Sequence, residues 1–186
     1  MFLDKKSEIE YYSGINSHAY VEKLIKDSDS LLIVSPYIDK YYAHFLISNS
    51  RGKKIKVLSS SAEKNAEKIL TQGIGIRYLL FGVIFFAVAN LFNYLLFGIN
   101  EIFILGTSIF LIFFMLIYPK GSKIEFRKPK GFVHSKFYIG ENGAIQGSAN
   151  LTYNGMHKNV ENISIIRDQE GIEKLRKEFY KIWDST

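Results

Sequence analysis

The sequence predicts an α/β sandwich into which a two-helix apolar hairpin is inserted. Short apolar runs that end in turn residues alternate with amphipathic stretches in both halves of the chain, a pattern typical of an α/β domain. Between residues 78 and 118 the only charged side chain is Glu101. The chain has 186 residues, of which 47% are hydrophobic. Without the apolar segment about 145 residues remain, enough for one α/β domain.

The first half predicts two strands and three helices. The run Leu31-Leu32-Ile33-Val34 is continuously apolar and ends at Ser35-Pro36, as expected of a strand buried on both faces. Apolar residues spaced for one helical face predict the helices. The expected helices are 18–26, 41–47 and 62–70, and the second strand is 55–59.

The second half predicts four strands and a closing helix. Glu141-Asn142-Gly143 separates two of these strands, and Asn-Gly accepts the positive φ that a tight hairpin turn requires. Apolar residues recur on one side of the last segment, which predicts a helix. The expected strands are 123–127, 132–139, 144–148 and 163–166, and the helix is 171–183.

The apolar segment predicts a transmembrane hairpin over residues 77–118, with residues 1–76 and 119–186 forming one domain. Its uncharged runs are 78–100 and 102–119, and about 20 apolar residues cross a bilayer core. A pair of helices buried in a soluble domain is the alternative, but such helices normally keep a polar stripe. The few polar residues are expected to form hydrogen bonds between the two helices. They are Asn90, Asn93, Thr107 and Ser108.

Charges at the ends of the hairpin predict its orientation. Arg77 precedes it and Lys120 and Lys123 follow it, whereas the turn carries only Glu101. The positive-inside rule then predicts a multi-pass protein with both soluble halves on the cytoplasmic side, and the lipid bilayer as a partner. The basic cluster that follows the hairpin also suits phosphate-rich substrates. Its members are Lys120, Lys123, Arg127, Lys128 and Lys130.

Two neighbouring segments carry residues suited to phosphate chemistry. On a strand, residues two apart share a face, which brings His134 together with Lys136, and Ser148 together with Asn150. The tight turn between the segments places all four at one end of a sheet. They supply a nucleophile or acid, a fixed positive charge and neutral donors, a set that suits a phosphodiester.

This arrangement resembles the H-x-K-x4-D and G-S-x-N signature of the phospholipase D superfamily. Downstream, Gly155, Asn159 and Glu161 match the G-x3-N-x-E tail of many members. Upstream, the Ser35-Pro36-Tyr37-Ile38 segment is similar to the start of small nuclease-type members. The sequence departs from the family pattern at Glu141, where an aspartate is usual, and the spacer from there to Gly147 is one residue shorter.

The resemblance implies a phospholipase D-like α/β/α sandwich and a phosphodiesterase that works through a phosphohistidine, without cofactor or metal. Members use two motifs that face each other, and this chain has one, which predicts a homodimer. The resemblance makes His134 the nucleophile in one subunit and the acid in the other. Phosphoryl oxygens would contact Lys136, Ser148 and Asn150. We expect Glu161 to orient the histidine, with Glu141, Gly147 and Asn159 in supporting roles.

The motif leaves the substrate open. Nucleic acid is slightly favoured, because small single-motif members are often nucleases. A phospholipid such as cardiolipin is the alternative, suggested by the apolar hairpin, and a non-catalytic phosphate-binding membrane scaffold is a third possibility. Among the other histidines, His18 and His44 lie in helical patterns, whereas His157 is close enough in sequence to touch substrate. Histidines and carboxylates do not recur at metal-ligand spacing, and there are no cysteines.

Overall fold

The computed structural model describes residues 9–72, 75–98, 101–117 and 123–186, and the chain divides into two compact units. The first unit combines residues 1–71 with 122–186, and the second covers residues 72–121. The predicted turn at 99–100, together with Lys120, lies outside the described residues.

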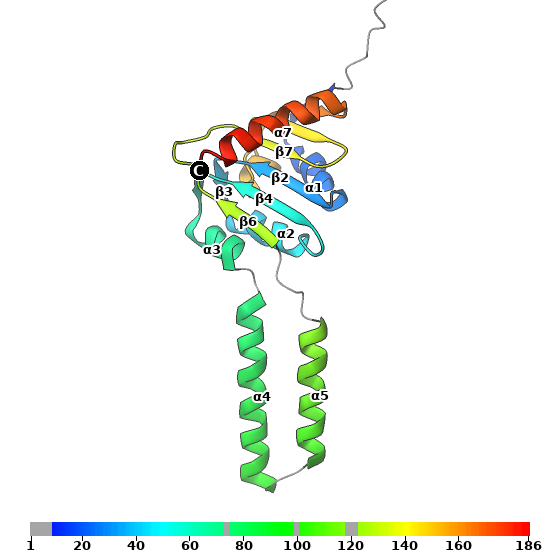
Figure 1. The fold of residues 1–186 in the computed structure, drawn as a ribbon, viewed down its shortest axis with the longest axis vertical. Coiled ribbons are helices and arrows are strands. Elements are labelled where there is room, and N and C mark those ends of the chain that lie inside the picture. Colours follow the sequence, from blue (N-terminus) through cyan, green and yellow to red (C-terminus); the bar gives the residue numbers. More distant parts are fainter. Residues whose placement is uncertain (1–8, 73–74, 99–100, 118–122) are drawn as a thin grey trace, which may run out of the picture. The chain divides into compact units, whose positions relative to one another are not determined.

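A seven-stranded mixed sheet is the centre of the first unit (Figure 1). Its strand order is β1-β9-β8-β7-β2-β4-β6, with parallel pairing in β2-β4-β6 and antiparallel pairing elsewhere. Two short strands, β3 (Tyr37–Ile38) and β5 (Ser61–Ala62), form a separate parallel pair. The seven strands are β1 (Ile9–Gly14), β2 (Ser30–Val34), β4 (Lys54–Leu58), β6 (Lys123–Arg127), β7 (Phe137–Ile139), β8 (Ala144–Gly147) and β9 (Glu161–Ile166).

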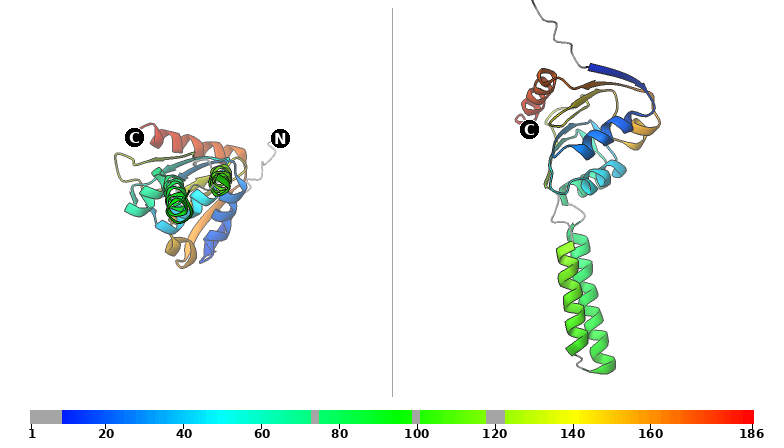
Figure 2. Two further views of the ribbon diagram at one scale, coloured as in Figure 1. Left: turned by 90° about the horizontal axis from the view of Figure 1, so that it is seen from below. Right: turned by 90° about the vertical axis from the view of Figure 1, so that its right-hand side faces the viewer.

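Helices cover both faces of this sheet and make the unit a three-layer α/β/α sandwich (Figure 2). Four helices contribute to the core on one face, namely α1 (Ser17–Asp27), α2 (Lys40–Ser48), α3 (Lys64–Gln72) and α6 (Tyr153–His157). The long helix α7 (Gln169–Trp183) covers the other face with Ile172, Phe179 and Trp183. The expected mixed α/β class is confirmed.

Strand β2 explains how one apolar run serves both layers. Its side chains alternate between the faces, so Leu31 and Ile33 enter one core, whereas Leu32 and Val34 enter the other. All four are at most 5% exposed. A strand in the middle of a covered sheet therefore needs no polar face, which is why the continuous apolar run was informative.

The structure shortens one predicted strand and adds elements that the sequence did not indicate. The expected strand at 132–139 is ordered as β7 over Phe137–Ile139 only. Its partner β2 ends at Val34, opposite Phe137, and the following Ser35-Pro36 leaves the sheet, so the preceding residues have no strand to pair with on that side. Strand β1 and helix α6 were not predicted.

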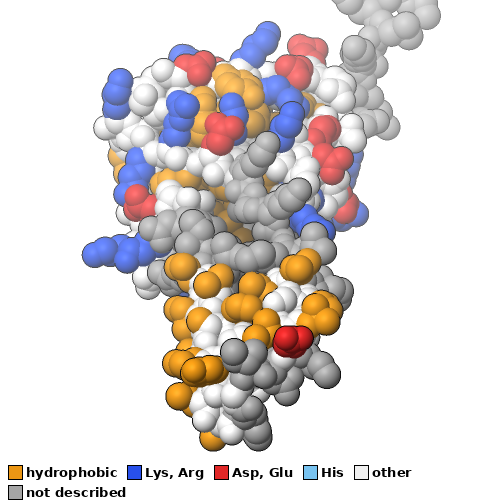
Figure 3. Space-filling view, turned by 60° about the horizontal axis from the view of Figure 1, so that its bottom comes forward, with side chains coloured by type: hydrophobic (Ala, Val, Ile, Leu, Met, Phe, Trp, Pro, Cys, Tyr) orange, Lys and Arg blue, Asp and Glu red, His pale blue; other side chains and the backbone are white. Residues whose placement is uncertain are grey.

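The second unit is a pair of helices, α4 (Gly75–Phe97) and α5 (Glu101–Ile117). Asn90 donates a hydrogen bond to Thr107 Oγ1 across the pair at 3.2 Å, as predicted, whereas Ser108 donates to Ile104 O in its own helix. Many apolar side chains of these helices are exposed (Figure 3).

The prediction of membrane-spanning helices is wrong: in the part of the chain that the structure describes, no helix is long and apolar enough to cross a membrane. Helix α5 has 17 residues and a length of about 26 Å, short of the roughly 30 Å of a hydrocarbon core. Helix α4 includes Arg77. The sequence argument counted uncharged residues as far as Pro119, beyond the end of the helix at Ile117. The expected multi-pass location with two cytoplasmic halves is therefore wrong, and the lipid bilayer is not shown as a partner.

Gly147 lies at the end of β8, in close contact with the backbone of β9. A Cβ atom there would lie 2.1 Å from Asn162 O and 2.8 Å from the Cα of Ile163. No side chain fits at this distance, because the obstructing atoms belong to the backbone of the paired strand. Gly147 is therefore required by packing at the point where the two strands present Ser148 and Glu161.

We expect Gly147→Ala to lower the free energy of unfolding by about 1–3 kcal/mol, because β8 and β9 must separate locally to admit the methyl group. Urea denaturation followed by circular dichroism measures this. Gly131→Ala is the matched control, since a Cβ at Gly131 would meet no atom within 4 Å. Equal stability of the two variants would show that β9 can shift without cost.

Candidate active site

The predicted site residues gather at one end of three neighbouring strands. His134 and Lys136 directly precede β7, Ser148 and Asn150 follow β8, and Glu161 begins β9. Because β7, β8 and β9 are successive antiparallel neighbours, the start of β7, the end of β8 and the start of β9 share one edge of the sheet. The structure thus brings together the motif residues that the sequence places up to 27 positions apart.

Lys136 and His134 are in direct contact. The Lys136 ammonium lies 3.2 Å from Nδ1 and 3.1 Å from Nε2 of the His134 ring, and it donates a 2.7 Å hydrogen bond to the His134 carbonyl oxygen. Lys136 is 6% exposed, whereas the His134 ring is exposed. A buried cation therefore supports a ring that remains accessible to substrate.

Burial lowers the pKa of the Lys136 ammonium below its ordinary value, and the negative charge of Glu161 opposes this shift. Desolvation penalises the charged form, so the site holds its positive charge at a cost. Such a charge gains from an anionic ligand, because a phosphoryl group would restore the electrostatic interaction lost with water.

Glu161 is buried and holds two neighbouring polar side chains. Ser148 Oγ donates a hydrogen bond to Glu161 Oε2, and Asn159 Nδ2 donates one to Glu161 Oε1 at 3.3 Å. Ser148 Oγ also accepts from the Asn162 backbone N–H at 3.0 Å. In this chain, Glu161 orients the serine and the asparagine of the motif; none of the hydrogen bonds among the described residues joins it to His134, the partner expected from the sequence.

Asn150 presents a buried oxygen to the site. Its Oδ1 atom has no hydrogen-bond partner among the described residues. A buried polar atom without a partner costs about 1–3 kcal/mol. Since the two ends of an amide are interchangeable by rotation, the same position can offer either an acceptor or an N–H₂ donor to a group from outside the chain.

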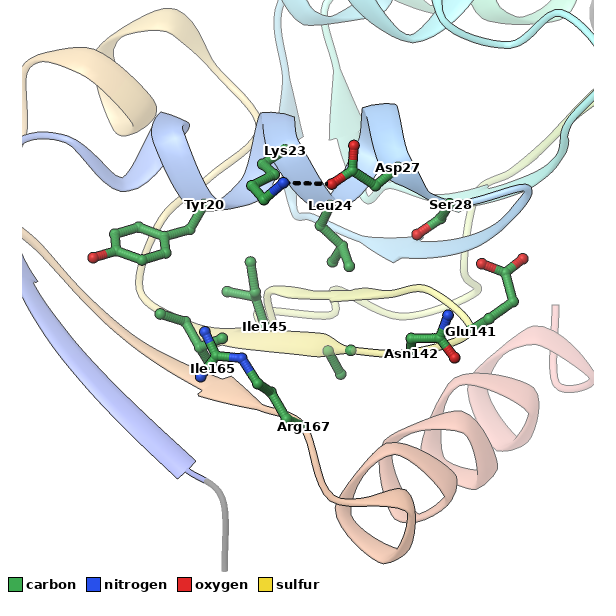
Figure 4. Close-up of a pocket in the computed structure, with 12 residues that line it drawn as sticks. Tyr20, Lys23, Leu24, Asp27, Ser28, Glu141, Asn142, Ile145, Ile165 and Arg167 are labelled. Carbon is green, nitrogen blue, oxygen red and sulfur yellow. Dashed lines mark hydrogen bonds and ion pairs between the residues drawn. The ribbon is translucent and has the colours of Figure 1, made fainter.

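Glu141 lies at the opposite end of the sheet from His134. It accepts a hydrogen bond from the Ser30 backbone N–H and lies beside a cavity of about 240 Å³ between α1 and the sheet (Figure 4). Leu24 and Ile145 form apolar parts of the cavity wall, and Arg167 lines it from the strand side. Glu141 is thus placed to tie the β7–β8 turn to the start of β2, and substitution of the usual aspartate does not touch the site.

The other histidines lie apart from His134 in the fold. His157 stacks on His18 with ring centroids 4.0 Å apart, and its Nε2 atom is 3.1 Å from the Tyr42 hydroxyl. Burial, followed by the neighbouring His18, lowers the pKa of His157. His44 is exposed on α2. Among the described residues no group of three or more histidine, aspartate and glutamate side chains is placed to hold a metal ion.

Much of the described basic cluster is engaged within the chain. Lys128 forms a 2.6 Å ion pair with Glu67, and the Arg127 guanidinium lies 4.3 Å from the centre of the Trp183 ring. Lys130 is exposed close to the site in sequence. The cluster therefore serves structure as well as surface charge, which composition alone did not indicate.

Two aromatic residues near His134 were overlooked in the sequence. Phe132 and Tyr37 are 61% and 44% exposed, and their ring centroids are 6.1 Å apart. The Phe132 ring centroid is 6.2 Å from that of His134. Phe132 was interpreted as part of a strand, and Tyr37 only as part of the Ser35-Pro36-Tyr37-Ile38 segment, so neither was recognised as an exposed ring.

Comparison with known proteins supports the resemblance to the phospholipase D superfamily that the motif residues indicate. Residues 114–183 match the family model described as cardiolipin synthase, PLD-like domain. The chain resembles the structure of Nuc, a phospholipase D family member from Salmonella typhimurium, with a TM-score of 0.58, 14% identity and coverage of 96% of both chains. The fold is that of the phospholipase D superfamily.

Other solved structures share this phospholipase D fold. NucT from Helicobacter pylori has a TM-score of 0.58 at 14% identity, covering 97% of this chain and 98% of its own. Phosphatidylserine synthase from Haemophilus influenzae has a TM-score of 0.50 at 13% identity, and the match covers 97% of this chain but 39% of the synthase. No curated protein sequence matches. The domain match and the shared fold together support a phosphodiesterase enzyme, a nuclease or a phospholipase.

We expect Lys136 to lose its proton below pH 10.5, the ordinary value for lysine, because burial favours the neutral amine. The lower pKa in the folded state means that unfolding takes up protons between the folded and unfolded values, so this group's penalty on stability is relieved as pH rises through that range. Carbon NMR titration of labelled lysine side chains, with Lys136→Met used to assign the resonance, measures the midpoint. A midpoint at or above 10.5 would contradict the prediction.

Proposed function

We propose that this protein is a phospholipase D-like phosphodiesterase that acts through a phosphohistidine on His134, with nucleic acid as its substrate. The observation that carries the proposal is the contact of the buried Lys136 ammonium with the exposed His134 ring. A nucleophile open to solvent and backed by a fixed positive charge suits attack on an anionic phosphodiester.

The reaction implied by the superfamily needs two histidines with different tasks. One His134 nitrogen attacks phosphorus and forms a P–N bond, while the P–O bond to the leaving group breaks and the leaving oxygen takes a proton from a second imidazole. Water then attacks phosphorus, the P–N bond to His134 breaks, and the second ring takes the proton that the water loses. Histidine suits both tasks because its reference pKa of about 6.5 makes both forms accessible near neutral pH.

A second copy of the chain would supply the second histidine. The sequence contains the motif once, and a symmetric dimer places the same patch of both subunits in contact. The motif residues support this, since they lie at one end of three neighbouring strands, the end that carries the exposed His134 and Ser148, and Asn150 Oδ1 has no partner among the described residues. Lys136, Ser148 and Asn150 of both subunits would then surround the phosphoryl oxygens.

A phospholipid such as cardiolipin is the second candidate substrate. The description of the matched family model and the phosphatidylserine synthase fold favour it. Nucleic acid is preferred because the exposed Phe132 ring lies 6.2 Å from the His134 ring and 6.1 Å from the exposed Tyr37 ring, and the exposed Lys130 is close to His134 in the chain. A scaffold that binds phosphates without catalysis is disfavoured by the intact His134, Lys136, Ser148 and Asn150.

We expect His134→Asn to abolish hydrolysis, with a loss of at least about a thousandfold in kcat, because asparagine cannot form the covalent intermediate. The measurement is cleavage of labelled single-stranded DNA, single-stranded RNA and cardiolipin in parallel, in EDTA, by the full chain. His44→Asn is the matched control, since His44 is exposed on α2. Activity of His134→Asn equal to wild type would exclude the proposed nucleophile, and a trapped phosphohistidine in wild type would exclude the scaffold.

Subunit mixing tests the shared site. After random exchange of equal amounts of wild-type and His134→Asn chains, one quarter of the dimers carry two histidines, so activity should fall to about half that of the unmixed proteins. Activity that stays proportional to the wild-type chains, with exchange shown by differently tagged subunits, would mean that each chain acts alone.

A further inference from the structure

Exposed aromatic rings form a row that starts at the nucleophile. The Phe132 ring lies 6.2 Å from the His134 ring, and the Tyr37 ring lies 6.1 Å from the Phe132 ring. Phe132 is 61% exposed and Tyr37 is 44% exposed. Large apolar rings that remain in water beside a reactive group are placed to meet a ligand, because they contribute little to the core.

Hydrogen bonds fix the backbone next to both rings. The Val133 backbone N–H donates to Ser60 Oγ at 2.9 Å, and Ser60 Oγ donates to the Val133 carbonyl at 3.2 Å, which fixes the loop that carries Phe132. Tyr37 belongs to β3, and its carbonyl accepts from Ser35 Oγ at 2.7 Å. Because the backbone is already fixed, little of its conformational entropy is lost when a ligand stacks on the rings.

Tyr41 and Tyr153 form a second pair of exposed rings, and Tyr41 is four residues after Tyr37 in the chain. Their centroids are 5.3 Å apart, and they are 47% and 42% exposed. Asp39 fixes the pair: it accepts from the Tyr42 backbone N–H at 2.9 Å and from the Tyr153 backbone N–H at 2.5 Å, which joins the starts of α2 and α6. Tyr37 is two residues before Asp39, so a short stretch of chain separates the two pairs.

Exposed cations accompany these rings. Lys158 lies 5.6 Å from the centre of the Tyr153 ring, the exposed Lys40 is next to Tyr41 in the chain, and the exposed Lys130 is two residues before Phe132. Aromatic rings combined with a positive surface are the usual means of binding single strands, because every base offers a π-face and every linkage a phosphate. In a duplex the bases are already stacked and paired, and extruding one costs a few kcal/mol.

We propose that Tyr37 and Phe132 form a base-stacking surface, continued by Tyr41 and Tyr153, that selects single-stranded nucleic acid and places the linkage beside a stacked base at His134. The inference rests on the proposed function, whose substrate it specifies. The same rings and lysines would also suit a lipid headgroup region, and vesicle binding is therefore an arm of the test.

The experiment measures binding separately from hydrolysis. The full chain with His134→Asn is titrated with a labelled single-stranded oligonucleotide, an abasic oligomer of the same length, the corresponding duplex, and vesicles containing cardiolipin. We expect the single strand to bind about tenfold or more tightly than the abasic oligomer and the duplex. Tyr37→Ala together with Phe132→Ala should weaken single-strand binding by about ten- to a hundredfold, and leave abasic binding unchanged.

Matched variants separate stacking from folding. Tyr37→Phe with Phe132→Tyr keeps both rings and should retain binding. Tyr11→Ala removes a tyrosine that is 77% exposed on β1, three strands from β7 in the sheet order. Equal binding of the single strand and the abasic oligomer would overturn the inference, as would an unchanged affinity in the double alanine variant. Vesicle binding that alone depends on the rings would do the same. If the wild-type chain hydrolyses no substrate but stacking is observed, the proposed catalysis fails and the binding surface stands.

Discussion

The charge of Lys136 is the constraint on which the arrangement of the site depends. An ammonium that is 6% exposed needs oxygen and nitrogen partners within the protein. It finds them by reaching back to the His134 carbonyl and ring, with the carboxylate of Glu161 as the opposing charge. Because β2 leaves the sheet at Val34, the residues before β7 do not continue as a strand, and the exposed His134 contacts the lysine from this irregular segment.

The same carboxylate links this group to the next two strands. Glu161 receives hydrogen bonds from Ser148 and Asn159, so residues from the ends of β8 and β9 share one anion with the lysine before β7. Gly147 permits the close approach that these bonds require, since Asn162 O occupies the space of a side chain. Packing, hydrogen bonding and charge thus act on one small region.

Local patterns predicted the elements in which burial follows a simple pattern. The run of β2 is apolar because the strand is buried on both faces, and the buried Ile172, Phe179 and Trp183 give α7 its amphipathic pattern. Strand β1 was missed because its side chains are exposed or half-exposed, so no apolar alternation marks it. The length of β7 was overestimated because its end is set by where β2 leaves the sheet, a long-range effect. The membrane prediction was wrong, since no helix among the described residues is long and apolar enough to span a membrane, and for α5 the uncharged run was counted beyond the end of the helix.

The candidate site was predictable in its members but not in its connections. Spacing alone indicated that His134 and Lys136 lie together, and the turn brought Ser148 close. The partner of Glu161 could not be deduced, because it depends on the register between β8 and β9. The rings of Phe132 and Tyr37 meet across distant parts of the chain, and the tie between Ser60 and Val133 that positions one of them spans 73 residues.

The path of the chain from β4 to β6 allows the two units to change independently. Parallel neighbours need a crossover, and α3 lies in that crossover on the core side of the sheet. The α4–α5 pair enters as a detour after α3, within the same connection, before the edge strand β6. No strand order would change if the detour were lengthened, shortened or lost. The helix pair can therefore vary in sequence and length while the strands that carry the candidate site, β7, β8 and β9, keep their order.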